Sequence, residues 1–235
     1  MLIDAINWLT NPSNWSGPGS IGLRIIQHLG ITFLAVLIAV SVALPAGIAI
    51  GHSRRGAGFV GGLTGAARAI PTLGLLTLAG LLVGIGITAP LIALVILAIP
   101  SLLAGAYAGV QAIAPSVTQS AKAIGLSGTQ VVFMVEVPLA SPTIVGGIRA
   151  ATLQVVSTST LAAYTADIGL GRFLFAGLKT RDYPQMLGAS ILVVALALIL
   201  EVLLAFAQRT ATRRYSRPAS NPQVSRHQKK AEYRK

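Results

Sequence analysis

The sequence contains no cysteine and few charged residues. Charged residues make up 10% of the 235 residues, whereas hydrophobic residues make up 54% and the mean hydropathy is +0.75. The lack of cysteine excludes disulfide bonds and thiolate metal sites. The shortage of charge excludes an ordinary soluble domain, because a domain of this length needs a charged surface to stay in solution. We therefore expect an integral membrane protein.

The sequence also lacks the motifs with which proteins bind nucleotides or metals. It has no Gly-Lys pair, and hence no phosphate-binding loop that ends in Gly-Lys-Ser/Thr. The histidines His28, His52 and His227 are isolated and lack metal-ligand spacing, which favours structural or solvated roles. The sequence pattern indicates no pair of nucleophile and general base that could support catalysis. We expect neither a cofactor nor catalysis, so the energy for active work must come from another subunit.

Positive charge is concentrated near the C-terminus. The net charge is +12, and nine of the 18 Lys and Arg residues lie from Arg209 onward. In a soluble protein such a balance would suggest nucleic acid as a partner. Here the basic stretch directly follows an apolar run, so the anionic cytoplasmic leaflet of a bilayer is the expected neighbour. We predict a basic, disordered cytoplasmic tail over residues 209–235 and no nucleic-acid partner.

Five apolar runs are long enough to cross a bilayer, which takes about 20 residues. The predicted spans are Leu29–Gly51, Phe59–Val83, Pro90–Val110, Leu139–Tyr164 and Met186–Ala207. They predict an all-α membrane domain over residues 25–208. The preceding residues 1–24 lack a basic start and a cleavage site, and their Trp8 and Trp15 suit an extracytoplasmic or interfacial segment rather than a signal peptide.

The number of spans and the basic tail together predict the orientation. Five spans place the two ends on opposite sides, and basic residues favour the cytoplasmic side of a plasma or inner membrane. We therefore expect the N-terminus outside and the C-terminus in the cytoplasm. The loop from Thr165 to Gln185 then lies outside, where its three basic residues weakly oppose the rule but are accompanied by Asp167 and Asp182.

Prolines and glycines recur within the predicted spans. Pro45, Pro71 and Pro100 predict kinked helices, which a moving pore uses more often than a simple anchor does. Small residues four apart let helices approach closely, and generic packing is enough to explain them. These pairs are Gly47/Gly51, Gly58/Gly62, Gly61/Gly65, Gly80/Gly84 and Gly105/Gly109.

The segment from Gln111 to Val137 interrupts the hydrophobic pattern on the predicted cytoplasmic side. Pro115 can begin a short helix there, and Gly125 can end it in a left-handed conformation. A second amphipathic stretch leads from Thr129 into Pro138. The pattern predicts helix, glycine break, helix and proline before the next span. It suits a knob that contacts a partner and, equally, an amphipathic loop on the lipid surface.

This segment resembles the loop that permeases of ATP-binding-cassette importers carry between two spans. In that family the pattern is Glu-Ala-Ala, three residues, Gly, nine residues and Ile-x-Leu-Pro. The corresponding residues here are Gln119, Ser120, Ala121, Gly125, Val135, Val137 and Pro138. The resemblance implies coupling helices that dock into cytoplasmic ATPase subunits, a second permease, identical or homologous, and an extracellular substrate-binding protein. Because Gln119 replaces the family's Glu, we expect docking to depend on shape more than on charge.

Shorter segments resemble permeases for quaternary-amine osmoprotectants. They are Arg68-Ala69-Ile70-Pro71-Thr72-Leu73, Tyr107-Ala108-Gly109-Val110, Ser159-Thr160-Leu161-Ala162-Ala163 and Gly169-Leu170-Gly171. The resemblance implies glycine betaine, choline or proline betaine as cargo, with another small solute such as an amino acid as the alternative. A membrane-embedded enzyme or a channel is a weaker alternative, because no catalytic constellation is present and a channel needs no docking loop. Few aromatic residues lie in the spans, so we expect high-affinity recognition to belong to the binding protein.

Two charged residues lie deep in predicted spans. Arg149 lies about 16 Å along a helix from Pro138, and Glu201 lies about 10 Å from the cytoplasmic end of its own span. Because their depths are comparable and buried membrane charges are usually paired, we predict an Arg149–Glu201 contact within one subunit or across a dimer. The alternative is that Arg149 extends to the cytoplasmic headgroups.

Other polar residues are candidates for a translocation path or gate. Arg68, three residues before Pro71, marks either the cytoplasmic edge or a central cavity. The run Ser157-Thr158-Ser159-Thr160 lies inside a span, with Gln154 one turn earlier. Consecutive positions face all around a helix, so only part of the run can line a path. Hydrogen bonding between helices is the alternative for these residues.

Overall fold

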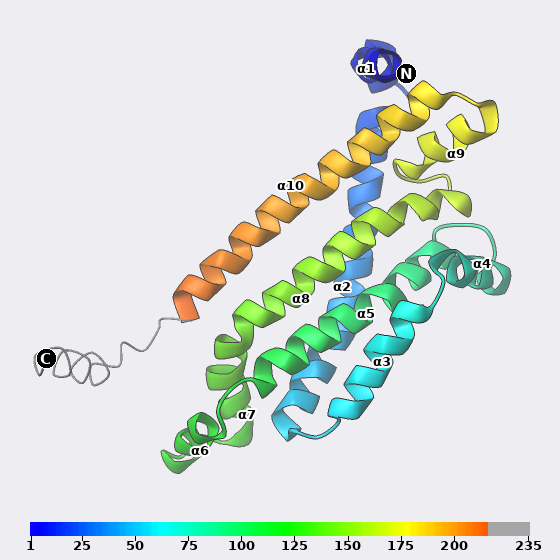
Figure 1. Cartoon of the computed structure of the whole chain (residues 1–235). Coiled ribbons are helices and arrows are strands. Elements are labelled where there is room, and N and C mark those ends of the chain that lie inside the picture. The colour runs from blue at the N-terminus through cyan, green and yellow to red at the C-terminus, as the bar shows by residue number, and fades with distance from the viewer. Residues whose placement is uncertain (216–235) are drawn as a thin grey trace, which may run out of the picture.

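Helices form the framework of the part of the chain that the structure describes. A computed structural model describes residues 1–215, with side chains for all of them except Arg68 and Tyr215. Four helices, one of them together with its flanking turns, are long and apolar enough to cross a membrane. They are α2 (Ile21–Ser53), α5 (Thr88–Gln111), α8 (Val137–Thr158) and α10 (Tyr183–Tyr215). α5 packs between α2 and α8, and α10 packs on α8 (Figure 1). The all-α membrane architecture predicted from hydropathy is confirmed.

The second predicted span is broken into two helices. α3 (Ala57–Ala69) and α4 (Thr72–Val83) meet at an angle of 86°, so the kink predicted at Pro71 within the span Phe59–Val83 is a sharp break between two helices. The break lies at Ile70 and Pro71. A residue before proline is disfavoured in the helical region, and Ile70 is extended at φ −71° and ψ 121°. Each half is about 18–20 Å long, too short to cross a bilayer alone. Spans therefore number four, or five if this bent pair is one span.

Pro45 and Pro100 lie within helices that continue through them. Pro45 lies inside α2 and Pro100 inside α5, and a further proline, Pro142, lies inside α8. Proline removes one backbone donor from a helix, and neighbouring helices tolerate this in membranes. Only at Pro71, among the prolines predicted to kink a span, does the chain leave the helical conformation.

Glycines bring the backbones of α2, α5 and α8 together. A Cβ on Gly47 of α2 would lie 2.7 Å from the Cβ of Ala106 in α5, and a Cβ on Gly105 would lie 2.7 Å from the Cα of Gly147 in α8. Such distances exclude any side chain without movement of the helices. Gly58 and Gly62 in α3 face open space instead. The spacing of small residues therefore marks helix contacts in α2 and α5 but not in α3.

The first and last long helices extend beyond their predicted bounds. α2 begins at Ile21 rather than Leu29, and its start is capped by the hydroxyl of Ser20. α10 continues to Tyr215, so the helix includes the first residues of the segment expected to be a disordered tail. Ala, Gln and Arg favour helix there, and the basic last turn suits the helix dipole. The remaining residues of the predicted tail, 216–235, lie outside the described part of the chain.

Short helices gather at the two ends of the bundle. α1 (Leu2–Thr10), a 3-10 turn over Pro12–Trp15 and α9 (Gly171–Thr180) lie at the end where α2 and α10 begin (Figure 1). There the ring of Trp8 meets that of Phe173 edge-on, with centroids 5.1 Å apart. α6 (Pro115–Ala123) and α7 (Gly128–Val131) lie at the opposite end, beside the end of α2. The bundle thus presents two chemically distinct ends to partners.

Candidate docking segment and transport path

Residues 112–136, here called the docking segment, form two short helices around a glycine. α6 ends in a Schellman motif: the N–H of Leu126 donates to the carbonyl of Ala121 at 3.2 Å, and the N–H of Gly125 donates to that of Lys122 at 3.0 Å. Gly125 has φ +97°, which residues with a Cβ rarely adopt. The left-handed break predicted at Gly125 is confirmed.

The second half of the docking segment runs directly into α8. A capping box begins α7, in which Gln130 N–H donates to the Ser127 hydroxyl at 3.4 Å and Ser127 N–H donates to the Gln130 side chain at 2.8 Å. A π-helical turn over Val132–Glu136 then joins α7 to α8. Pro138 is predicted to separate the second short helix from the next span, but it does not break the helix. It occupies the first turn of α8, where a missing backbone N–H is tolerated.

The predicted docking residues differ in their exposure. Gln119 and Ser120 are exposed on α6, whereas Ala121 is buried under α7 and the π-turn. Val135 and Pro138 are half-buried where the segment joins α8. Ile124, just before Gly125, is 80% exposed, and Phe133 and Met134 are 66% exposed. The segment therefore presents mainly apolar and uncharged polar side chains on a compact turn, with Lys122 as its exposed charged residue.

Two side chains from the end of α2, neither of them among the predicted site residues, contact the docking segment. The Nδ1 atom of His52 lies 2.7 Å from a carboxylate oxygen of Glu136, which is 2% exposed. Arg54 donates from Nη2 to the backbone carbonyl of Ile113 at 2.6 Å. These contacts join residues far apart in sequence, and no local spacing pattern reveals them.

Two of the polar candidates for a path, Gln154 and Thr158, line separate small cavities beside α5. Gln154 is exposed on α8 and accepts a hydrogen bond from the hydroxyl of Ser101 at 3.3 Å. A cavity of about 20 Å³ lies here, lined by Thr64, Ala67, Leu97, Pro100, Ser101 and Gln154. Thr158 lines a second cavity of about 10 Å³ with Thr72, the residue after Pro71. The side chain of Arg68 lies outside the described residues.

The residues of the polar run Ser157-Thr158-Ser159-Thr160, at the end of α8, lie in different environments. Ser159 is fully buried, and its hydroxyl lies 3.1 Å from that of Thr32 in α2, so it joins two helices. Ser157 is exposed on the other side and donates to the carbonyl of Leu153 at 3.0 Å. Of the two roles weighed from the sequence, hydrogen bonding between helices therefore occurs at Ser159. Path lining by Ser157 and Thr158 stays a prediction.

Arg149 and Glu201 lie in contact within one subunit. Arg149 donates from Nε to one carboxylate oxygen of Glu201 at 2.8 Å and from Nη2 to the other oxygen, and from Nη1 to the amide oxygen of Gln208 at 2.8 Å. Gln208 in turn donates to the carbonyl of Pro142 at 3.4 Å. This bidentate arrangement ties α8 to α10 within one subunit, as one of the two predicted alternatives has it.

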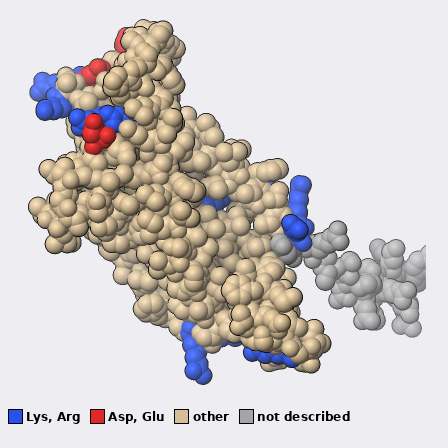
Figure 2. All heavy atoms as spheres, turned by 180° about the vertical axis from the view of Figure 1, so that it is seen from behind, with Lys and Arg blue, Asp and Glu red and all other residues tan. Residues whose placement is uncertain are grey.

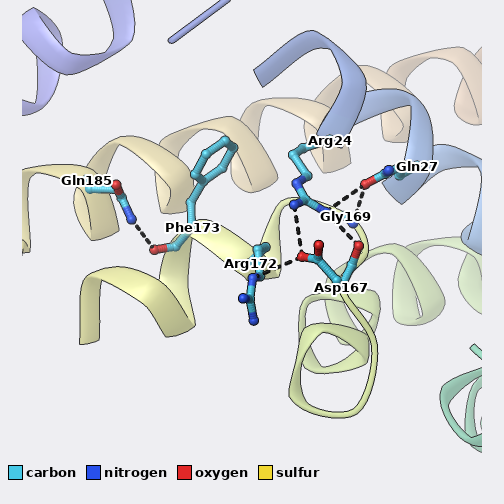
Figure 3. A network of polar contacts seen from close by, with 7 residues as sticks. All are labelled: Arg24, Gln27, Asp167, Gly169, Arg172, Phe173 and Gln185. Atoms are coloured by element: carbon cyan, nitrogen blue, oxygen red, sulfur yellow. Dashed lines mark hydrogen bonds and ion pairs between the residues drawn. The ribbon is translucent and has the colours of Figure 1, made fainter. Parts of the chain in front are cut away.

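A network at the opposite end holds the loop before α9 against α2 (Figure 3). Arg24, which is 8% exposed, donates to the backbone carbonyl of Asp167 at 2.7 Å and to its carboxylate at 2.9 Å. Arg172 contacts the same carboxylate at 3.0 Å. Gln27 accepts from Arg24 at 3.0 Å and from the N–H of Gly169 at 3.2 Å. The sequence pattern indicates Asp167 only as a counter-charge to nearby basic residues.

The Gly169-Leu170-Gly171 triplet allows this loop to pass close to two other elements. Gly169 has φ +74°, and a Cβ there would lie 3.1 Å from Nδ1 of His28. A Cβ on Gly171 would overlap the carbonyl of Thr160. His28 is buried and lies 2.8 Å from the carbonyl of Val156 through Nε2. His28 thus has a structural role, as its isolation in the sequence suggests.

Residues 43–217 match the family described as binding-protein-dependent transport system inner membrane component. The chain belongs to this family. It is 32% identical over 186 residues to the glycine betaine/carnitine/choline transport system permease protein OpuCB of Bacillus subtilis, which covers 79% of this chain and 86% of the relative. It is 30% identical to the choline transport system permease protein OpuBB of the same organism, over 83% and 89% of the two chains.

The chain is also similar to a third permease in sequence and to a solved transporter structure in fold. The carnitine transport permease protein OpuCB of Listeria monocytogenes is 34% identical over 74% of this chain and 80% of its own. A structure of the MetNI methionine transporter in inward-facing conformations matches with a TM-score of 0.71 at 22% identity, over 86% of this chain and 99% of that chain. The chain is therefore a permease subunit of an ATP-binding-cassette importer, a transport component rather than an enzyme.

Proposed function

We propose that this permease carries quaternary-amine osmoprotectants, such as glycine betaine, choline or proline betaine, into the cell. The observation that carries the proposal is the likeness to permeases named for choline, carnitine and glycine betaine over most of their length and of this chain. The glycine triplet that packs the loop before α9 is among the segments that resemble such permeases. The permease works beside a second permease copy or paralogue, two cytoplasmic ATPase subunits and an extracellular binding protein.

The end that carries α6 and α7 is the cytoplasmic end in this proposal. Among the described residues, Arg54, Arg55 and Lys122 lie at that end with one acidic residue, the buried Glu136, and the last turns of α10 add Arg209, Arg213 and Arg214. The opposite end carries basic residues together with Asp4, Asp167 and Asp182, and Figure 2 shows acidic side chains grouped near one end of the face it presents. Basic residues favour the cytoplasmic side of a membrane, so the N-terminus lies outside.

The docking segment is the proposed contact with the ATPase. Its tip carries Ile124, whose side chain is 80% exposed, and Gln119, Ser120 and Lys122 are exposed on α6 just before it. Large apolar side chains exposed on a compact turn are typical of surfaces that a partner covers. The Schellman motif around Gly125 sets the angle between α6 and α7, so the shape of this tip depends on one residue with positive φ.

The proposed path runs along the face of α5 and α8 that carries Ser101, Gln154 and Ser157, beside the break at Pro71. Polar side chains at such depth usually face water or another protein segment rather than lipid. The two cavities on this face measure about 20 Å³ and about 10 Å³, too small for a solute larger than a water molecule. A second permease and a change in conformation are therefore needed to complete the path.

Uptake by reconstituted vesicles tests the cargo. The permease is assembled with its ATPase and binding protein, and ATP-dependent entry of labelled choline, glycine betaine, methionine and histidine is measured separately. We expect entry of the two quaternary amines, with the amino acids excluded. Uptake of an amino acid without uptake of either quaternary amine would contradict the proposed cargo and leave the family assignment intact.

Co-purification tests the docking segment. Gly125→Ala adds a Cβ at a positive φ, whereas the control Gly128→Ala adds one in the first turn of α7 with nothing within 4 Å. We expect the first variant to release the ATPase and the control to retain it. Because the contact depends on shape, Gln119→Glu and high salt should leave the complex intact. Dissociation in high salt, or a stable complex with Gly125→Ala, would contradict this account.

A further inference from the structure

The cytoplasmic end of α2 contacts both ends of the docking segment. Arg54 reaches the carbonyl of Ile113, which precedes α6, and His52 reaches the carboxylate of Glu136, which precedes α8. The segment is joined covalently to α5 before Ile113 and to α8 after Glu136. α2 has no such covalent connection to it. These two side chains therefore provide the direct polar link from α2 to the segment among the described residues.

The His52–Glu136 contact is built into the packed interior. Glu136 is 2% exposed, and a buried carboxylate is costly unless a donor faces it. Nδ1 of His52 lies 2.7 Å from a carboxylate oxygen of Glu136 and donates to it in the tautomer that is protonated at Nδ1; the His52 side chain is 31% exposed. The π-turn over Val132–Glu136 places the carboxylate toward α2 just before α8 begins. The position of α8's first turn is thereby tied to the last turn of α2.

The Arg54 contact depends on the left-handed backbone conformation of Arg54. Arg54 is the residue that ends α2, and it has φ +54°, which few residues other than glycine adopt. In this conformation its guanidinium reaches the Ile113 carbonyl at 2.6 Å. Ile113 is itself buried against Val110 and Ala140. The residue thus holds the turn between α5 and α6 from the side of α2.

The end of α2 also packs rigidly on α5. A Cβ on Gly51 would lie 2.8 Å from the Cβ of Val110, so the two backbones meet near the docking segment. A displacement of α6 and α7 therefore reaches α5 and α8 through the chain and α2 through His52 and Arg54. We infer that His52 and Arg54 are positioning residues that make α2 move with the docking segment when the ATPase subunits close and open. This inference rests on the proposed docking function of that segment.

The test measures the ATP hydrolysed per choline imported by the whole transporter in vesicles. His52→Leu removes the donor, whereas His52→Asn keeps an N–H near the position of Nδ1. Arg54→Asn removes the guanidinium while asparagine tolerates the left-handed conformation, and Arg55→Asn is its exposed neighbouring control. We expect His52→Leu and Arg54→Asn to retain the ATPase but to raise the ratio about 2- to 30-fold, the range typical of residues that couple two sites. His52→Asn and Arg55→Asn should stay near the unmodified protein.

The outcomes separate this inference from the proposal beneath it. A normal ratio in both His52→Leu and Arg54→Asn overturns the inference, as does a ratio for His52→Asn equal to that for His52→Leu. If His52→Leu fails to accumulate in the membrane, Arg54→Asn leaves the buried pair intact and decides alone. Failure of the docking proposal would instead appear as a stable, active complex in Gly125→Ala. Loss of the ATPase from the His52 or Arg54 variants would also overturn the inference, since they would then act on binding.

Discussion

The guanidinium of Arg149 in α8 binds both carboxylate oxygens of Glu201 in α10. Its third nitrogen binds the side chain of Gln208, about two helical turns further along α10. Each charge compensates the other at a depth where an isolated charge is unfavourable. Removing both partners should therefore cost less stability than the sum of the two single removals. We expect Arg149→Gln and Glu201→Gln each to lower the thermal unfolding temperature in detergent, and the double variant to lose less than the two single losses combined.

Strictly additive losses would contradict a direct energetic role for this ion pair. Gln208→Leu provides a matched control, because it removes one neutral partner and leaves the ion pair in place. Its effect should be smaller than that of either charged variant.

Backbone contact at Gly105 should make this position intolerant of any side chain. A Cβ there would meet the backbone of Gly147, so Gly105→Ala forces α5 and α8 apart at a cost of about 1–3 kcal/mol. Gly62→Ala in α3 has open space around it and gains helix propensity. We expect a lower unfolding temperature for the first variant and an unchanged or higher one for the second. The reverse order would contradict the packing of α5 against α8.

Arg24 should matter more than Arg172, although both contact the carboxylate of Asp167. Arg24 is buried and donates to three oxygens, whereas the side chain of Arg172 is 50% exposed and makes one contact. Arg24→Gln should destabilise the protein by about 2–4 kcal/mol, because it removes charge-assisted bonds that hold the loop to α2. Arg172→Gln should cost about 0–1 kcal/mol. Equal effects in thermal unfolding would contradict the different burial of the two residues.

Gln154 offers a test of the path that separates transport from assembly. Gln154→Leu removes the exposed amide beside Ser101, whereas Thr152→Val changes a hydroxyl that is bonded within its own helix to the carbonyl of Ile148. If the face of Gln154 lines the path, the first variant should slow uptake of labelled choline while its ATPase stays bound. The control should transport normally. Equal choline uptake by the two variants would contradict a translocation path along the face of Gln154.

Much of the fold follows from hydropathy and local chemistry. Apolar length predicts α2, α5, α8 and α10, and the conformational freedom of glycine predicts the break at Gly125. The contact between Arg149 and Glu201 could be anticipated because helix rise converts sequence position into depth. In each of these cases the physical cause lies within a single element, or in the depth of a residue within the bilayer.

Features that depend on other elements could not be predicted in this way. The sharp bend at Pro71 differs from the uninterrupted helices at Pro45 and Pro100, although each proline lies in an apolar run. The burial of Glu136 beside His52 and that of Arg24 beside Asp167 join residues far apart in sequence. No periodicity encodes such pairs. The exposed amide of Gln154 was a candidate from its type alone, and its contact with Ser101 needed the packing of α5 on α8.

The central claim, that the docking segment binds the ATPase on the cytoplasmic side, can be tested by site-specific cross-linking. Because the sequence lacks cysteine, a single introduced thiol is the only one on the permease. A photoactivatable maleimide is attached to Ile124→Cys at the exposed tip of the segment, or to Leu2→Cys at the opposite end, in the assembled transporter. We predict that the ATPase subunit is cross-linked from Ile124→Cys and not from Leu2→Cys. Cross-linking from Leu2→Cys, or its absence from Ile124→Cys in a complex that hydrolyses ATP, would contradict the account.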